Sequence, residues 1–178
     1  MREPFRTDIA VIRKRARENM KQGPVTGGYH ADRSLVVAVL NEALATEIVC
    51  VLRYKNHHHM ARGVHGAVAA AEFLEHANEE QAHVELLASR IIALGGIPDF
   101  APETLTTRSH TEYRQGTSLV EMIKEDLIAE RIAIETYSDM ARWLGEDDPT
   151  SRRLIETILE KEEEHADDLA DLLDGIPG

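Results

Sequence analysis

The chain has 178 residues, of which 43% are hydrophobic, 4% aromatic and 29% charged. This length suits one domain with a sizeable core, and the hydrophobic fraction excludes a disordered chain. The net charge of −12 argues against a polyanion-binding protein, because an acidic domain repels phosphates. A single cysteine, Cys50, excludes an internal disulfide framework and a four-cysteine zinc site. Without a signal-peptide pattern or an unbroken apolar run of membrane-spanning length, we expect a soluble, cytoplasmic protein.

The N-terminal segment is basic and predicted to be partly helical. Ile9, Ile12 and Ala16 recur at helical spacing within residues 7–22, and glycines and a proline follow. Residues 1–21 carry seven Lys and Arg against three Asp and Glu, which makes DNA binding a candidate role. Packing on a neighbouring subunit is preferred, because the helix has an apolar side. We therefore divide the chain into an extension, 1–30, and one helical domain, 31–175.

Four long helices are predicted in the domain. Asp32 and Ser118 are suitable N-caps for the first and third helices, and Pro149 suits the first turn of the fourth. Residues 95–117 hold prolines, glycines and threonines, and this connection is long enough to run the length of a helix. The two flanking pairs are then antiparallel hairpins, and the second and third helices are parallel. The predicted helices are 32–62, 67–94, 118–144 and 148–174.

Each long helix has an apolar stripe that a glutamate interrupts near its middle. Offsets of three and four residues keep each glutamate on the buried face of its helix. Two of the glutamates are followed by a histidine three residues later on the same face. Tyrosines follow the other two by seven residues, so the two hairpins resemble copies of one unit. The residues of this repeated pattern are Glu47, Tyr54, Glu80, His83, Glu130, Tyr137, Glu162 and His165.

Four buried carboxylates in one layer require protons or cations. Ionised and unpaired, they would be severely destabilising, and Lys and Arg are missing from the adjacent stripe positions. Two divalent metals would balance four negative charges, and two imidazoles would supply neutral nitrogen ligands. This donor set is typical of di-iron carboxylate sites and suits Fe or Mn. The alternative is that His83 and His165 lie on solvent-exposed acidic faces, as the acidic run over 160–164 favours.

The motifs resemble those of the ferritin superfamily, especially bacterioferritin and Dps-like mini-ferritins with a bacterioferritin-type di-iron site. The likeness covers about residues 33–174 and is carried by 41–47 with Tyr54, by 80–83 with 92–98, and by 162–165. The resemblance implies an all-α, ferritin-like four-helix bundle with one long crossover, here preceded by a short N-terminal helix.

The resemblance also implies roles for individual residues. Glu47 and His83 would bind one iron, Glu130 and His165 the other, and Glu80 and Glu162 would bridge the two. The implied activity is ferroxidase: Fe(II) is oxidised by O2 or H2O2 and stored as ferric mineral inside a homo-oligomeric shell. Tyr54 would be a catalytic redox tyrosine or a hydrogen-bond partner; a packed core tyrosine is the alternative. Mn or Zn are possible substitutes for the two Fe ions.

Three departures from the family pattern refine these expectations. Gln81 stands where bacterioferritin has its haem-binding methionine, so we expect no haem. The short segment after His165 leaves no room for a fifth helix, which favours a shell of 12 subunits over 24. The basic extension before Asp32 is an addition to the bacterioferritin pattern.

Several alternatives remain open from the sequence. A manganese catalase, a rubrerythrin-like peroxidase or a monooxygenase would use the same bundle, and a Dps-type protein would protect DNA. Residues 57–59 are three consecutive histidines that form either a polar helix end or an iron uptake or transit site. Cys50 lies one position off the ligand stripe and is interpreted as a buried small residue.

Overall fold

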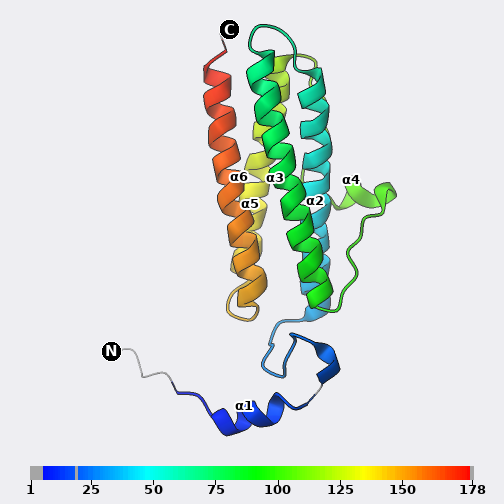
Figure 1. Ribbon diagram of the computed structural model, residues 1–178, viewed down its shortest axis with the longest axis vertical. Coiled ribbons are helices and arrows are strands. Elements are labelled where there is room, and N and C mark those ends of the chain that lie inside the picture. The colour runs from blue at the N-terminus through cyan, green and yellow to red at the C-terminus, as the bar shows by residue number, and fades with distance from the viewer. Residues whose placement is uncertain (1–5, 19, 177–178) are drawn as a thin grey trace.

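The computed structural model describes residues 6–18 and 20–176. The regular secondary structure of these residues consists of helices, without strands. Four long helices lie side by side along one axis, and α1 lies beyond one end of the bundle (Figure 1). The long helices are α2 (Arg33–Met60), α3 (Gly66–Ala93), α5 (Leu119–Leu144) and α6 (Pro149–Asp174). The predicted all-α bundle is confirmed.

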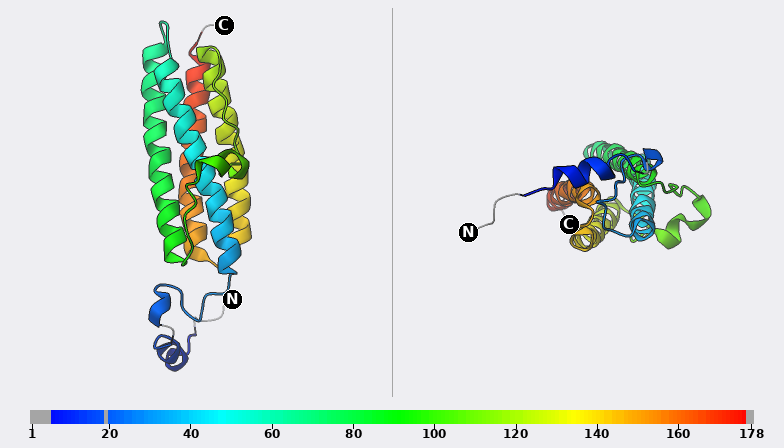
Figure 2. Two further views of the ribbon diagram at one scale, coloured as in Figure 1. Left: turned by 90° about the vertical axis from the view of Figure 1, so that its right-hand side faces the viewer. Right: turned by 90° about the horizontal axis from the view of Figure 1, so that it is seen from below.

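The chain path has the predicted topology. Helices α2 and α3 form one antiparallel hairpin, and α5 and α6 form the other (Figure 1). Between the hairpins the chain returns along the outside of the bundle, so that α5 starts at the end where α3 starts (Figures 1 and 2). The parallel α3 and α5 follow from this single long crossover.

The helix starts follow the predicted capping chemistry. The Asp32 carboxylate accepts hydrogen bonds from the backbone N–H groups of Ser34 (2.9 Å) and Leu35 (3.3 Å). The Ser118 hydroxyl accepts one from the N–H of Glu121 (3.2 Å). Pro149 occupies the first turn of α6 behind the capping residue Asp148. These caps fix where the long helices begin, and thereby which residues reach mid-bundle.

The crossover between the hairpins contains structure that the sequence did not predict. A 3-10 turn, η2 (Pro102–Thr104), leads into a short helix, α4 (Leu105–Arg108), which packs on α2. Leu105 joins Ala45 and Val49 of α2 in a small apolar cluster. A four-residue helix is too short to give a recognisable periodic pattern, so the crossover was predicted only as a connection.

The N-terminal segment is partly helical, as predicted. Helix α1 (Ile9–Arg15) lies in its first half, and a 3-10 turn, η1 (Met20–Gln22), lies near its end. None of its residues is buried, and so short a helix is marginal without packing. The segment that leads into α2 contacts the bundle through Tyr29, whose hydroxyl donates to the Asp148 carboxylate at 2.9 Å.

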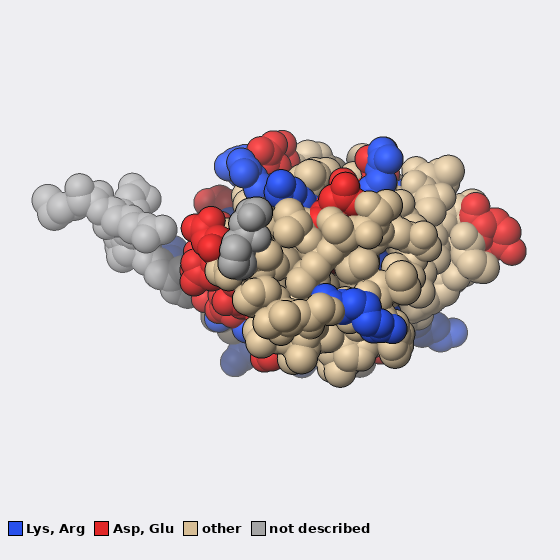
Figure 3. All heavy atoms as spheres, turned by 90° about the horizontal axis from the view of Figure 1, so that it is seen from above, with Lys and Arg blue, Asp and Glu red and all other residues tan. Residues whose placement is uncertain are grey.

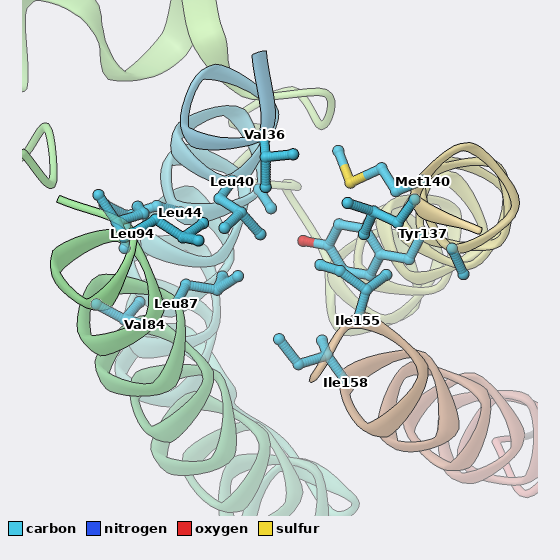
Figure 4. Close-up of a cluster of buried hydrophobic side chains, with 14 of the residues drawn as sticks. Val36, Leu40, Leu44, Val84, Leu87, Leu94, Tyr137, Met140, Ile155 and Ile158 are labelled. Atoms are coloured by element: carbon cyan, nitrogen blue, oxygen red, sulfur yellow. The ribbon is translucent and has the colours of Figure 1, made fainter. Parts of the chain in front are cut away.

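The bundle interior has an apolar cluster in each half. One half is packed by Leu40 and Leu44 of α2, Leu87 of α3, and Ile155 and Ile158 of α6. Figure 4 shows these side chains pointing inward from their helices, together with Tyr137, whose hydroxyl oxygen points into the interior. The other half is packed by Tyr54, Phe73, Ile123 and Leu169, among others. The middle of the bundle, between the two clusters, holds the polar residues described next.

Helix α2 is long and apolar enough to cross a membrane by length and composition. In the described fold it lies against α3 and α5, and more than half of its most apolar stretch is buried. A central bundle helix requires the same apolar composition, and the packing observed here accounts for it.

Candidate metal centre

Four glutamates, one from each long helix, lie buried between the two apolar clusters. Glu47, Glu80, Glu130 and Glu162 are each at most 1% exposed, and His83 and His165 are 5% and 1% exposed. The alternative that the two histidines lie on solvent-exposed faces is therefore wrong. The offsets of three and four residues along each helix place these side chains in the interior, as the sequence predicted.

The six side chains form two overlapping groups whose donor atoms lie within 4.8 Å of one another. In the first group, His83 Nδ1 lies 3.0 Å from Glu47 Oε2 and 3.2 Å from both Glu80 Oε2 and Glu162 Oε1. Ligand atoms about 3.0–3.4 Å apart are what an ion with metal–ligand bonds of about 2.1 Å requires. This group is Glu47, Glu80, His83 and Glu162.

The second group shares two carboxylates with the first. His165 Nδ1 lies 3.7 Å from Glu80 Oε1 and 3.6 Å from Glu162 Oε2. Glu80 and Glu162 thus face both histidines, which is the position of bridging ligands between two ions. Glu130 completes the group, which is Glu80, Glu130, Glu162 and His165. The structure brings all six predicted residues together.

Two tyrosines donate hydrogen bonds to the centre, each to the glutamate of the opposite hairpin. The Tyr54 hydroxyl of α2 donates to Glu130 of α5, and the Tyr137 hydroxyl of α5 donates to Glu47 of α2. Both tyrosines are fully buried. Each hydrogen bond links one hairpin to the other and holds a carboxylate that is not shared between the two groups. Tyr54 is therefore a hydrogen-bond partner of the centre, and Tyr137 is its counterpart in the second hairpin.

Several donor atoms of the centre have no hydrogen-bond partner. Buried polar atoms are normally paired, so a concentration of unpaired ones marks a place for a ligand. The atoms are Glu80 Oε1, Glu130 Oε2, Glu162 Oε1 and His165 Nδ1, all in the two groups. Carboxylate oxygens and imidazole nitrogens are donors that iron and manganese accept, so the residues fit a dinuclear metal centre.

Burial and mutual repulsion control the protons of the centre. Burial and the charge of Glu80 raise the pKa of Glu47 to about 8, and burial with the charges of Glu162 and Glu80 raises the pKa of Glu130 well above its usual range. Burial also disfavours ionised Glu80 and Glu162, but hydrogen bonds from their neighbours lower the pKa of both. Burial and repulsion thus favour the protonated forms of Glu47 and Glu130, and hydrogen bonds favour the ionised forms of Glu80 and Glu162.

The histidines carry the balancing charge. Burial disfavours a charged imidazole, but the surrounding carboxylates raise the pKa of His83 far above its usual range and that of His165 to about 12. These contacts favour the charged form of both imidazoles in the metal-free centre. Metal binding must release these protons, because only neutral imidazole and ionised carboxylate are ligands.

A further carboxylate orients His165. Its Nε2 atom lies 2.7 Å from Glu79 Oε2, so its Nδ1 faces the bridging glutamates. Lys161 lies 3.5 Å from the other Glu79 oxygen. A carboxylate on the outer nitrogen fixes the ring of a metal-binding histidine and raises its basicity. Glu79 was not identified from the sequence, because it is one of many acidic residues on these helices.

The three consecutive histidines do not form one site. His57 is fully buried, and its Nδ1 atom lies 2.7 Å from Asp126 Oδ2. Arg53 binds the other oxygen of the same carboxylate at 2.8 Å. His58 donates to the backbone carbonyl of Ala70, and His59 is exposed. His57 is therefore neither a residue of a polar helix end nor a residue of an iron uptake site. Its imidazole lies in the buried network around the Arg53–Asp126 ion pair.

Cys50 is buried, as predicted, at 2% exposure. Its sulfur lies 3.7 Å from the Thr111 hydroxyl and 3.4 Å from Arg53. Burial raises the pKa of the thiol well above its usual range. Cys50 is therefore a neutral packing residue beside the centre.

The chain matches known proteins over most of its length. A model of the Ferritin family, described as a ferritin-like domain, matches residues 37–178. The bacterioferritin of Desulfovibrio desulfuricans is 30% identical over 142 residues, which cover 79% of this chain and 75% of that protein. A nutrient stress-induced DNA-binding protein of Nostoc is 33% identical over 150 residues, 80% of each chain.

Solved structures agree with these matches. The bacterioferritin-related dodecameric thioferritin of Bacteroides fragilis superposes with a TM-score of 0.78 at 32% identity, over 82% of this chain and 88% of that one. The D. desulfuricans bacterioferritin, whose di-iron site has been described in different catalytic states, gives a TM-score of 0.70 at 28% identity over 80% of each chain. The buried glutamate and histidine layer and these matches together show that the chain belongs to the ferritin-like family.

Proposed function

We propose that this chain is an iron storage and detoxification protein that oxidises Fe(II) at a dinuclear centre formed within each chain. The observation that carries the proposal is the buried layer of four glutamates and two histidines, several of whose donor atoms have no partner in the protein. Two ferrous ions bound side by side can give two electrons to O2 or H2O2. The relatives that share this fold include bacterioferritins, among them one with a di-iron site.

The ligand assignment follows from the two groups of donor atoms. Glu47 and His83 would hold one iron, and Glu130 and His165 the other. Glu80 and Glu162, which face both histidines, would bridge the pair. Tyr54 and Tyr137 would hold the two terminal carboxylates in place, and Glu79 would orient His165.

We further propose that the chains assemble into a hollow homo-oligomer of 12 subunits. The B. fragilis relative is described as dodecameric, and it matches 82% of this chain at 32% identity. The exposed apolar side chains of α1, Ile9, Val11 and Ile12, suit packing on a neighbouring subunit. Light scattering during size-exclusion chromatography should give a mass near twelve times the 19.9 kDa chain. A monomer or dimer would contradict the shell.

Anaerobic titration with Fe(II) tests the dinuclear centre. Tight binding should saturate at about two ions per chain, and addition of O2 should then oxidise both. The Glu80→Gln variant should lose this tight phase, because one bridging oxygen becomes an amide nitrogen. The matched control is Glu75→Gln, which changes an exposed glutamate of the same helix. Tight binding that stays intact in Glu80→Gln would contradict the assignment.

Peroxide assays separate this proposal from the other di-metal enzymes. A manganese catalase would disproportionate H2O2 when loaded with Mn(II), whereas an iron storage protein should consume O2 or H2O2 only in proportion to added Fe(II). DNA protection is a different function, which the net charge of −12 disfavours. A gel shift that survives moderate salt would support it.

A further inference from the structure

A third cluster of ligand-type side chains lies outside the dinuclear centre. Glu72, His76 and Asp168 bring one nitrogen and two carboxylate oxygens within 4.8 Å of one another. Glu72 precedes His76 by one helical turn on α3, and Asp168 follows His165 by three residues on α6. None of the three belongs to the centre proposed above.

His76 directs an unpaired nitrogen into this cluster. The residue is 1% exposed, and its Nε2 atom has no hydrogen-bond partner. That atom lies 3.2 Å from Glu72 Oε1 and 3.7 Å from Asp168 Oδ2. Around an ion with bonds of about 2.1 Å, ligand atoms stand about 3.0–3.4 Å apart, so small side-chain movements would give all three atoms bonding distance to one ion.

The tautomer of His76 follows from its other nitrogen. The Tyr54 hydroxyl has one proton, which it donates to Glu130. His76 Nδ1, 3.3 Å from the Tyr54 oxygen, must then be the donor in that contact. In a neutral ring this leaves a lone pair on Nε2, which faces two carboxylates that also offer only lone pairs. A cation is the partner that satisfies all three.

The ring of His76 also contacts the dinuclear centre. It stacks on the ring of His165 at 4.1 Å between centroids. A neutral ring is the form that ligates a metal.

We propose that Glu72, His76 and Asp168 form a third, mononuclear site for a first-row divalent cation, one helical turn from the dinuclear centre. The carboxylates are partly open to solvent, with side-chain exposures of 30% for Glu72 and 56% for Asp168. Figure 3, which views this end of the bundle, shows acidic side chains gathered at one edge, where α6 ends. The exposed acidic residues of those last turns are Asp167, Asp168, Asp171 and Asp174.

Zinc binding to the metal-free protein tests the third site. Calorimetric titration with Zn²⁺ should show a weaker binding event beyond the tight ones, because this site has three protein ligands and is open to water. The Glu72→Gln/Asp168→Asn variant should lose that event, with affinity reduced at least tenfold. The matched control, Glu75→Gln/Asp167→Asn, removes the same charge from exposed positions of the same two helices and should keep it.

The outcome separates this site from the dinuclear centre. In Glu80→Gln the tight binding should fall while the weaker event persists. Crystals soaked in Zn²⁺ should show anomalous density within about 2.2 Å of His76 Nε2. Two outcomes would overturn the proposal, independently of the result at the dinuclear centre. One is that Glu72→Gln/Asp168→Asn binds zinc as the wild type does. The other is that the control Glu75→Gln/Asp167→Asn loses the weaker binding event as well.

Discussion

The hydroxyl of Tyr54 donates to the carboxylate of Glu130, across the interface between the two helical hairpins. The same relationship recurs with the hairpins exchanged, because Tyr137 donates to Glu47. Each tyrosine follows the glutamate of its own helix by seven residues, or two helical turns, and yet binds the glutamate of the other hairpin. The seven-residue spacing thus serves to join the two halves of the bundle at the centre.

Removal of either tyrosine hydroxyl should destabilise the protein. In Tyr54→Phe the buried Glu130 loses its hydrogen bond, which should cost about 1–3 kcal/mol and lower the melting temperature by several degrees. Tyr137→Phe should have a similar effect, because the two contacts are equivalent. Thermal unfolding of metal-free protein measures both. Tyr113→Phe, at a tyrosine that is 38% exposed, is the control; an equal loss there would show that the buried contacts contribute nothing specific.

The stability of the metal-free protein should fall as pH rises from 6 to 8. The pKa of Glu47 is raised to about 8, so the folded state holds a proton that the unfolded state has already lost above its own pKa near 4.5. The raised pKa of His165 acts with the same sign above pH 6.5, since its stabilisation is present below that value and lost as pH rises toward about 12. Glu47 alone contributes about 2 kcal/mol over this range.

Urea unfolding of chelator-treated protein at pH 6, 7 and 8 measures this dependence. Glu47→Gln, which removes this titrating carboxyl, should make the fall in stability smaller by about 2 kcal/mol and leave the histidine contribution in place. A rise in stability across the range would show that the carboxylates are ionised and paired in the metal-free fold.

Metal affinity should depend on pH in the opposite direction. Binding of two metal ions must displace the protons of Glu47, Glu130, His83 and His165, so higher pH favours the loaded state. Zn²⁺ titrations at pH 6 and 8, in buffers of different ionisation enthalpy, count the protons released. Several protons per chain are expected. Release of none would mean that the ligands are already deprotonated.

The buried contact between Arg53 and Asp126 should matter more than exposed ion pairs. Arg53→Met removes the guanidinium partner of the buried Asp126 carboxylate and leaves the His57 imidazole beside it, which should cost about 3–5 kcal/mol of unfolding free energy. Arg142→Met removes an exposed contact with Asp139 and should cost less than about 0.5 kcal/mol. Denaturant unfolding compares the two variants. Equal losses would contradict a structural role for the buried pair.

The sequence by itself determined the long helices, their order and the buried position of the glutamate layer. Glu47, Glu80, Glu130 and Glu162 could be placed in the interior because an α-helix repeats every 3.6 residues, so a stripe of apolar neighbours predicts the direction of each side chain. The capping residues Asp32 and Ser118 fixed two helix starts for the same local reason.

Only the tertiary structure decided which side chains meet across the bundle. His76 is a buried histidine, but its own helix does not show that Asp168 of α6 faces it or that its ring stacks on His165. The burial of His57 against Asp126 likewise depends on how α2 packs against α5. Such contacts are set by the rotation and offset of packed helices, which periodicity within one helix leaves undetermined.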